Sequence, residues 1–333
     1  MSSQTIAPGT ARFSQRYPGL VKVLALIGRR VIAAAVTLLG VSVLSFLLVH
    51  LVPGDPVRIM LGNQATPEAV AQLRHSFGLD RPLPAQYLSY LDGLLHGNLG
   101  TSVRTGQPVL TEIGQRLPST LLLGGAAMAL AVAFGVAAGV AAATVRRRSA
   151  AAAVNGIILL GMAVPTFCVG VLLILAFGIW LPVFPVIDDG SARALVLPSV
   201  ALALPAATYL ARLVKGGMLE VLGEDYIRTA RAKGAPERRV LFRHALGNAL
   251  LPVVTVIGLQ FGALMTGAAV IEVVFSRPGL GSYAVTAIQD RDFPQIQGTI
   301  MVVAALFVAV NLCVDLLYLI IDPRGAGGDH GAR

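Results

Sequence analysis

Long apolar blocks separated by polar segments dominate the hydrophobic pattern of this 333-residue chain. Six blocks reach about 20 predominantly apolar residues, the length that an α-helix needs to cross the roughly 30 Å hydrocarbon core of a bilayer. They run from Val31 to Val52, Ser119 to Val145, Val154 to Trp180, Leu195 to Val214, Leu250 to Ile271 and Gly298 to Ile321. A backbone in lipid must satisfy its own hydrogen bonds, and the two-residue alternation of barrel strands is absent. The pattern predicts an all-α integral membrane protein with six transmembrane helices.

Two prolines and one long polar segment modify this picture. Pro165 and Pro205 fall inside the third and fourth blocks and are expected to kink those helices. The segment 53–118 is too long for a tight turn and alternates helical stretches, Pro67 to Phe77 and Pro84 to Leu95, with glycine-containing breaks. In the second stretch Tyr87, Leu88, Leu91 and Leu95 recur at helical spacing. We therefore predict a small helical cap between the first and second spans.

Basic residues orient the chain, because Lys and Arg near helix ends are retained on the cytoplasmic side. With the N-terminus inside, the cytoplasmic segments hold 18 of the 26 Lys and Arg, whereas the outer segments hold ten of the seventeen acids. This places tails 1–30 and 322–333 in the cytoplasm, the cap outside, and residues 119–321 as a five-helix core. The first tail is polar and basic, so we expect it to be retained, with helix 31–52 as an uncleaved signal anchor.

Composition agrees with a membrane protein and removes several function classes. Hydrophobic residues make up 55% of the chain and charged residues 13%, against about 45–50% and 25% in soluble domains. The net charge of +9 follows from topology and attraction to anionic membrane lipids, so no nucleic-acid partner is expected. Cys168 and Cys313 both lie within predicted helices and imply neither a disulfide framework nor a metal cluster.

Catalytic motifs are missing from the sequence. No lysine stands in a phosphate-binding loop, and no histidine begins a His-Glu-x-x-His zinc site. A serine protease would have to pair Ser42 with His50, at the far end of the same helix. An aspartyl protease needs two carboxylates, and Asp315 is the only acid well inside a predicted helix. We expect a non-catalytic chain with no catalytic residue, metal site or cofactor of its own.

The inner loop 217–249 has the signals of two short helices. Asp225 to Lys233 begins with acids and ends with Arg231 and Lys233, the arrangement that the helix dipole favours. Gly234 then suits the left-handed cap position. Pro236 restarts a second helix, which runs through Leu246 with an apolar side and a basic side. The loop is predicted to be a helix, turn and helix on the inner face; an amphipathic hairpin that only lies on anionic lipid is the alternative.

This loop resembles the ATPase-docking loop of bacterial ABC importer permeases. The resemblance rests on Asp-Tyr-Ile-Arg-Thr-Ala-Arg-Ala-Lys-Gly at 225–234 and Arg-His-Ala-Leu-Gly-Asn-Ala-Leu-Leu-Pro at 243–252. Arg228, Thr229 and Ala230 stand where the family has Glu-Ala-Ala, and Gly234 is its glycine; Arg228 replaces the acid, and Leu251-Pro252 falls some four residues late. The resemblance implies that a coupling helix docks on an ATPase through Asp225, Arg228, Thr229, Ala230, Arg231, Lys233 and Gly234.

Further motifs extend the resemblance from about residue 28 to residue 324. In order they are Val52-Pro53-Gly54-Asp55-Pro56, Gly78-Leu79-Asp80-Arg81-Pro82, Asn98-Leu99-Gly100-Thr101-Ser102, Glu272, Phe275 to Gly281, Arg291-Asp292-Phe293-Pro294, Asp315, Tyr318 and Asp322-Pro323-Arg324. This series is similar to the first permease subunit of dipeptide, oligopeptide and nickel importers. The resemblance implies a type I ABC importer permease in the cell membrane, working with a second homologous permease, one or two ATPases that hold ATP and Mg, and an extracytoplasmic solute-binding protein.

The cargo stays open at this stage. Peptide is preferred, because it is the commonest cargo of the resembled family and no cluster of His, Cys or Met would guide a metal ion. The same machinery could import nickel, heme or glutathione. A different class, an ion-coupled secondary transporter, would use Asp315 as its proton site. The predicted cap would shield the mouth and receive the binding protein, or only pack on the outer helix ends.

Two further groups are candidate working residues. Glu272 sits at the outer, C-terminal end of the fifth helix, where the dipole disfavours an acid, so a salt bridge to Arg277 or Arg291 is expected. An outer gate or binding-protein contact would comprise Glu272, Phe275, Arg277, Pro278 and Gly279, with Pro278-Gly279 in a type II turn. Asn311, Asp315 and Tyr318 share one face of the last helix, for subunit packing or for the pathway.

Overall fold

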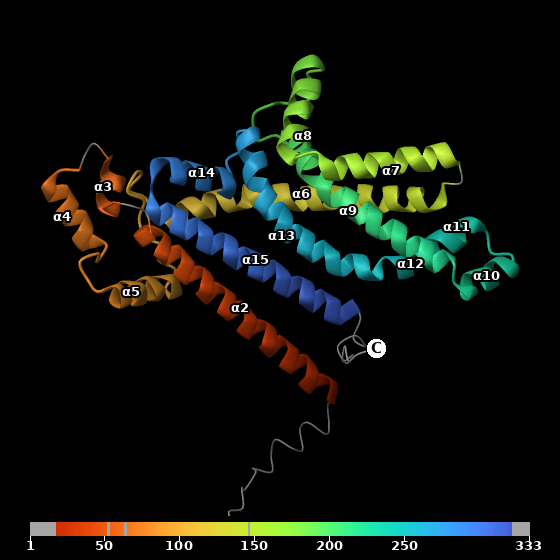
Figure 1. Cartoon of the computed structure of the whole chain (residues 1–333), viewed down its shortest axis with the longest axis horizontal. Helices are drawn as coiled ribbons and strands as arrows, with labels where there is room; N and C mark the ends of the chain where they lie inside the picture. Colours follow the sequence, from red (N-terminus) through yellow and green to blue (C-terminus); the bar gives the residue numbers. More distant parts are fainter. Residues whose placement is uncertain (1–17, 52–53, 63–64, 146, 322–333) are drawn as a thin grey trace, which may run out of the picture.

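The computed structural model describes the backbone of residues 18–51, 54–62, 65–145 and 147–321 and most of the side chains from residue 28 to 314, and helices dominate these ranges (Figure 1). The long elements are α2 (Pro18–Leu51), α6 (Val109–Thr144), α7 (Arg148–Ala163), α9 (Val196–Leu222), α13 (Leu251–Val274) and α15 (Phe293–Ile321). The shorter ones are α3 (Pro56–Leu61), α4 (Pro67–Ser76), α5 (Leu83–Leu95), α8 (Thr166–Leu173), η2 (Ile174–Trp180), α10 (Asp225–Ala232), α11 (Glu237–Arg239), η3 (Val240–Ala245), α12 (Leu246–Ala249) and α14 (Leu280–Asp290).

Five long helices and one bent helix pair account for the six apolar blocks. Five single helices are long and apolar enough to cross a bilayer, and the pair Ser149–Ala163 and Thr166–Trp180 makes a sixth span if its two parts act together. The predicted helical membrane fold is confirmed. Helix ends differ from the expected ones: α6 begins ten residues before Ser119, and α9 runs on to Leu222. The added turns of α6 contribute Val109 and Ile113 to a buried cluster with Leu280 and Tyr283 of α14.

The two prolines inside apolar blocks have different effects. At Pro165 the structure has a break of 106° between α7 and α8 rather than the expected kink within one helix. Val164 is extended (ψ 124°), as a residue before proline prefers to be. Pro205, by contrast, lies inside α9, which continues through it without a break.

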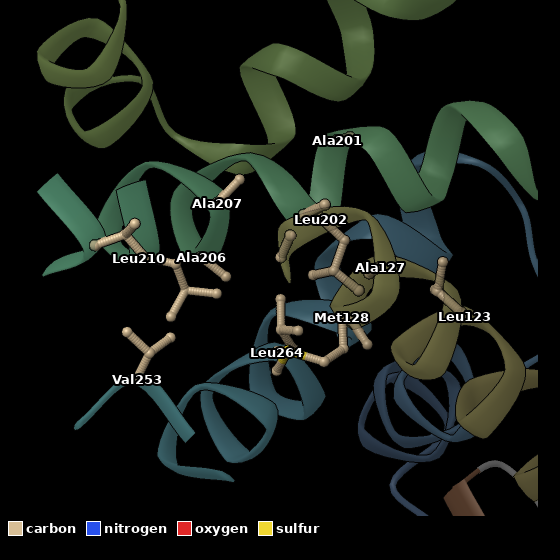
Figure 2. Packing of buried hydrophobic residues seen from close by; sticks show 14 of the residues in the cluster. Leu123, Ala127, Met128, Ala201, Leu202, Ala206, Ala207, Leu210, Val253 and Leu264 are labelled. Atoms are coloured by element: carbon tan, nitrogen blue, oxygen red, sulfur yellow. The ribbon is translucent and has the colours of Figure 1, made fainter. Parts of the chain in front are cut away.

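Parallel helices α6 and α9 form the centre of the molecule through a seam of small residues. A Cβ added to Gly135 would lie 2.8 Å from the carbonyl oxygen of Ala207, and one added to Gly139 would lie 2.7 Å from that of Ala211. Small residues let two helix backbones approach closely in a membrane protein. Figure 2 shows the adjoining core, in which Leu123, Ala127 and Met128 of α6 face side chains of α9 and α13.

The seam predicts a large difference between two glycine substitutions in α6. Gly139→Ala should destabilise the protein by about 1–3 kcal/mol, as overpacking does, because the new methyl group meets the α9 backbone. Gly125→Ala is the matched control, since no atom lies within 4 Å of its Cβ position and alanine is the better helix former. The unfolding temperature of each variant in detergent tests this, and equal values would contradict close packing at the seam.

The order of contacts gives the relative directions of the spans from α6 to α15. Because α6 and α9 are parallel, α7, α8 and η2 must return the chain to the side where α6 starts. Helix α9 then runs antiparallel to the following segment, since Gly217 meets Ala249 while Leu202 meets Gly267. Helices α13 and α15 are antiparallel in the same way, through Gly258 with Val314 and Gly262 with Phe307.

The spans therefore define two sides of the molecule. Helices α3 to α5 lie on one side, called the cap side, and α10 to α12 lie on the other, called the hairpin side (Figure 1). The first turns of α2 and the last turns of α15 also point to the hairpin side in Figure 1. The described chain thus has up to six spans, and its first and last long helices, α2 and α15, both have their outer ends on the side that carries the hairpin.

The cap is helical at the expected places, with α4 and α5 within one residue of the predicted stretches. Helix α5 packs along α2: the Tyr87 hydroxyl lies 2.9 Å from the Ser42 hydroxyl, and His50 Nε2 lies 3.1 Å from Gln86 Oε1. The predicted apolar stripe of α5 is divided, since Leu88 and Leu95 are exposed whereas Tyr87 is half-buried. The cap thus presents apolar side chains outward, as well as toward α2.

Candidate functional site

The hairpin between α9 and α13 is built as its sequence predicts. Helix α10 ends at Ala232, and Gly234 adopts the left-handed conformation (φ +78°) expected of the cap. The Ala235 N–H donates to the Ala230 carbonyl at 3.1 Å, which closes the helix end. Across the turn, Arg231 forms a 2.8 Å ion pair with Glu237, the first residue of α11. The return segment α11, η3 and α12 is continuous, so the hairpin is one compact unit.

Buried side chains fix the hairpin to the transmembrane core. Ile227 of α10 and Val240 of η3 are fully buried in the main hydrophobic cluster. The Tyr226 hydroxyl accepts from Asn248 Nδ2 at 2.8 Å and donates to the His244 carbonyl at 3.3 Å. Helix α10 has eight residues, too few for an isolated helix to be stable in water, so these contacts determine its position.

The predicted docking residues lie along α10 and in the turn that follows it. Ala230 is half-buried, and the others are exposed: Asp225, Arg228, Thr229, Arg231, Lys233 and Gly234. Arg228, which stands at the position of the family's acid, forms a 3.2 Å ion pair with Asp225. Such exposed pairs contribute about 0–1 kcal/mol. Both partners can therefore exchange this contact for one with another protein at little cost.

Glu272 is held by hydrogen bonds, so the expected salt bridge to Arg277 or Arg291 is wrong. Its side chain is fully buried at the end of α13. The carboxylate accepts from the Thr120 hydroxyl at 2.6 Å and from the N–H groups of Gly281 and Ser282 at 2.8 and 3.1 Å. These two N–H groups belong to the first turn of α14, whose dipole favours a nearby anion. A neighbouring helix start thus compensates the unfavourable position that Glu272 has on its own helix.

The expected type II turn at Pro278-Gly279 is also wrong. Such a turn needs a positive φ at the glycine, but Gly279 is extended (φ −125°, ψ −176°) and caps α14. A Cβ added to Gly279 would collide with the carboxylate carbon and both oxygens of Glu272. Glycine is therefore required here by the close approach of a buried carboxylate rather than by its conformational freedom.

Two further residues of this motif, Phe275 and Arg277, are buried, whereas Pro278 is exposed. Phe275 is buried in the main core. Arg277 is 6% exposed and pairs at 3.1 Å with Asp188, which is 11% exposed and belongs to the segment between η2 and α9. The motif from Glu272 to Gly279 thus joins α6, α13, α14 and that segment. This burial supports a role in fixing the outer turn; a gate that moves these residues stays a prediction.

A second buried polar network on the cap side has no counterpart in the sequence-based predictions. Glu112 of α6 accepts from the Tyr283 hydroxyl at 2.6 Å and from Gln295 Nε2 at 3.0 Å. The Ser102 hydroxyl donates to Asp292 at 2.7 Å and accepts from Gln295 at 3.0 Å. Burial and the neighbouring Glu112 raise the pKa of the Tyr283 phenol, so Tyr283 remains a donor. The network ties the end of the cap segment to α6, α14 and α15.

The break at Pro165 lies beside a hollow at the middle of the spans. This hollow, of about 300 Å³, lies between the break, α9 and α13 and is lined by Thr166, Tyr209 and Gln260 among mainly apolar residues. Non-helical backbone at membrane depth is tolerated where it is buried in protein or lines a water-filled cavity. Interrupted helices are also where transporter folds place substrate sites. The hollow is therefore a candidate part of a solute path.

The last candidate group is only partly described. Positions 311, 315 and 318 all lie on α15. Asn311 is half-buried, while the side chains of Asp315 and Tyr318 lie outside the described residues. Their proposed roles stay predictions.

No group of three or more His, Cys, Asp or Glu that could hold a metal ion occurs among the described side chains. Cys168 and Cys313 have free thiols, one half-buried and one exposed. The described polar clusters are hydrogen-bond networks and ion pairs, which suit structural support and solute or protein contacts.

Two protein-family models match the chain. Residues 135–326 match the model described as binding-protein-dependent transport system inner membrane component. Residues 23–124 match the model for the N-terminal part of such membrane components. The first match covers the hairpin and the spans around it, and the second covers α2, the cap and the start of α6.

Several curated proteins are similar over nearly their whole length. A probable peptide ABC transporter permease of Sinorhizobium fredii is 42% identical over 304 residues, covering 89% of this chain and 97% of the relative. The dipeptide transport system permease protein DppB of Escherichia coli is 41% identical over 320 residues, with coverages of 86% and 94%. The glutathione transport system permease protein GsiC of Salmonella choleraesuis is 41% identical over 295 residues, with coverages of 89% and 96%.

Proposed function

The chain belongs to the family of binding-protein-dependent transport system inner membrane components, and from this premise we propose that it is the permease subunit through which an ATP-driven importer moves peptides. The observation that supports this most directly is the hairpin. A short helix, anchored by Ile227, presents an exposed polar face at the position where the family docks its ATPase. The chain itself carries no phosphate-binding loop.

We propose three kinds of protein partner. A second, homologous permease would complete the translocation path, one or two ATPase subunits would bind α10 on the hairpin side, and a solute-binding protein would meet the cap side. ATP and Mg would be held by the ATPase subunits, and this chain would be non-catalytic. The family is one of binding-protein-dependent transport, which supports this division of labour.

Peptides are the proposed cargo. The relatives from Sinorhizobium fredii and Escherichia coli are described as peptide and dipeptide permeases. Glutathione is the second candidate, since a relative of similar identity is described as a glutathione permease. The sequence resemblance also allows nickel or heme as the cargo of the same kind of importer. A binding assay on the solute-binding protein encoded with this chain would distinguish these cargoes.

The protein is a multi-pass inner membrane component, and we propose that its hairpin side faces the cytoplasm. The excess of Lys and Arg in the hairpin and the two tails supports this orientation. The cap would then face the extracytoplasmic space. Protease digestion of inside-out vesicles should cleave at the exposed hairpin residues Lys233 and Arg238 and spare the cap.

ATP dependence separates an ABC importer from an ion-coupled transporter that uses Asp315. In proteoliposomes containing both permeases, the ATPases and an external solute-binding protein, dipeptide uptake should require internal ATP and persist when ionophores remove the proton gradient. Uptake that is driven by the gradient without ATP, and is lost in Asp315→Asn, would contradict the proposal.

The cap is proposed to receive the binding protein. Deleting residues 67–95, which removes α4 and α5, should abolish the stimulation of ATP hydrolysis by the loaded solute-binding protein. The exposed apolar residues of α5 would lose their contact with that protein, while the hairpin would keep the ATPases bound. The double variant Leu88→Ser/Leu95→Ser is the milder counterpart, because both side chains are exposed. Unchanged stimulation in both variants would show that the cap only packs on the helix ends.

A further inference from the structure

A polar hollow opens on the cap side between three parts of the chain that are far apart in sequence. It measures about 710 Å³ and lies between the outer part of α6, residues 188–195 and the turn between α13 and α14. Its polar lining consists of Gln115, Arg116, Ser119, Asp188, Ser191 and Arg277. This volume falls in the range of roughly 300–1,000 Å³ that small-molecule sites occupy. The size and lining suit a small polar solute.

Arg277 is buried, and one of its hydrogen-bond donors has no acceptor among the described residues. Its Nη1 pairs with Asp188 at 3.1 Å. Its Nε is buried and has no acceptor among the described residues. A guanidinium group carries five N–H donors, and its planar fork matches a carboxylate. A buried donor without an acceptor destabilises the folded chain. An anion that accepts a hydrogen bond from Nε would remove this cost.

Arg116 is held in place by contacts other than an ion pair. Its guanidinium lies 4.4 Å above the ring of Tyr283, and its Nη1 donates to the Glu112 carbonyl at 3.0 Å. Among the described residues it forms no salt bridge. Both contacts orient the group and leave its positive charge without a carboxylate partner. Such an arrangement is already organised to receive an anion, since few side-chain rotamers need to be frozen on binding.

The hollow has a net positive charge and an additional donor. Its charged lining residues are Arg116 and Arg277, both positive, and Asp188, which is negative, so the balance is +1. The Ser119 hydroxyl is also buried and has no hydrogen-bond partner among the described residues. Two cations and a free hydroxyl therefore converge on one space from α6 and from the α13–α14 turn.

We propose that this hollow binds the free carboxylate group of a peptide cargo, with Arg116 and Arg277 as the cationic partners and the Ser119 hydroxyl as a further donor. The inference rests on the proposed function and deepens it. A terminal carboxylate is the anionic group that all unmodified peptides share, so a site built around it accepts many sequences. On the cap side, the hollow thus favours peptides over solutes that lack a carboxylate group.

A thiol reporter tests the charge of the hollow without measuring transport. Ser191→Cys places a reactive group at its exposed rim, in a chain that also carries Cys168→Ser and Cys313→Ser. In phosphatidylcholine nanodiscs holding both permeases and the ATPases, an anionic thiosulfonate should react faster than a cationic one of equal size. At low salt, a net unit positive charge about 6 Å away in water should raise the labelling rate of the anionic reagent about threefold and lower that of the cationic reagent about threefold. The ratio of the two rates should therefore be roughly tenfold. Ser76→Cys on the cap, outside the hollow, is the control.

Peptide protection tests the ligand. Millimolar dialanine should slow labelling of the reporter at least about threefold, whereas dialanine amide, which lacks the carboxylate, should not. Arg116→Gln should abolish protection and reduce the rate ratio, and Arg116→Lys should keep much of both. The double variant Asp188→Asn/Arg277→Gln avoids a buried unpaired acid and should also lose protection. Equal protection by both peptides, or by neither, overturns the proposal, as does full protection in Arg116→Gln.

Two further measurements separate the remaining outcomes. If phosphatidylglycerol in the nanodiscs slows labelling as dialanine should, a lipid phosphate is the occupant and the peptide proposal fails. ATP-dependent dipeptide uptake is measured in parallel with the unmodified chain. Uptake without protection by dialanine overturns only the carboxylate site, whereas the absence of uptake for every peptide overturns the proposed function.

Discussion

Ile227→Ala is expected to lower ATP-driven uptake at least about thirtyfold and to release the ATPases from the purified complex. Truncating a fully buried isoleucine costs about 2–5 kcal/mol, and Ile227 has no exposed surface at all. The loss falls on an eight-residue helix that depends on its tertiary contacts. The amount of ATPase that co-purifies with the permease, together with uptake in proteoliposomes, measures the effect.

The graded control is Ile227→Val, which removes one methylene group and should cost only about 0.5–1.5 kcal/mol. The unfolding temperature of the transmembrane core should change little in either variant, because α10 lies outside the spans, in the hairpin between α9 and α13. Full uptake with normal ATPase retention in Ile227→Ala would contradict the docking role of α10. A large fall in unfolding temperature would instead assign Ile227 to the stability of the whole fold.

Glu272→Ala is expected to destabilise the fold by about 3 kcal/mol or more. The substitution leaves the Thr120 hydroxyl and the N–H groups of Gly281 and Ser282 without their acceptor. Each buried donor left unsatisfied costs about 1–3 kcal/mol. The unfolding temperature in detergent should therefore fall by several degrees, and proteolysis at the α13–α14 turn should accelerate.

Asp290→Ala serves as the matched control, since this carboxylate ends the same α14 helix but pairs with exposed Arg104 at 3.7 Å. Exposed pairs of this kind contribute about 0–1 kcal/mol, so the unfolding temperature should hardly change. If Glu272→Ala keeps its stability but loses uptake, the residue acts as a gate rather than as a support for the outer turn. Glu272→Gln, which retains one acceptor oxygen, should lie between the two.

The sequence was sufficient for the features that depend on local physics. Bilayer thickness and the cost of an unsatisfied backbone determine the six spans, and these follow from block length alone. The hairpin follows from helix-end signals, and Gly234 occupies the expected conformation. Proline inside an apolar block was ambiguous, because a kink and a full break share one local signal. Contacts with α9 and α13 accompany the break at Pro165, whereas α9 continues through Pro205.

Features that depend on distant pairs could not be predicted in this way. Glu272 meets a hydroxyl 152 positions earlier in the chain, so its nearest basic neighbours in sequence gave the wrong partner. The need for glycine at position 279 comes from the same carboxylate, whereas the Pro-Gly sequence suggested a common turn instead. Glu112 looked like an ordinary acid in an outer loop because the start of α6 was placed ten residues too late. An acid four residues before Arg116 at a helix start could have signalled the earlier start.

The glycine seam between α6 and α9 has a mechanical consequence. Two backbones in such close contact, over about two turns, cannot slide past each other without a collision, so the pair behaves as a rigid lever. The hairpin-side end of α9 is separated from α10 by only Gly223 and Glu224, while the cap-side part of α6 carries Arg116. In the proposed importer, a tilt of α9 imposed by an ATPase bound to α10 would therefore reach Arg116, which lies roughly 40 Å along α6 from its hairpin-side end at 1.5 Å per residue.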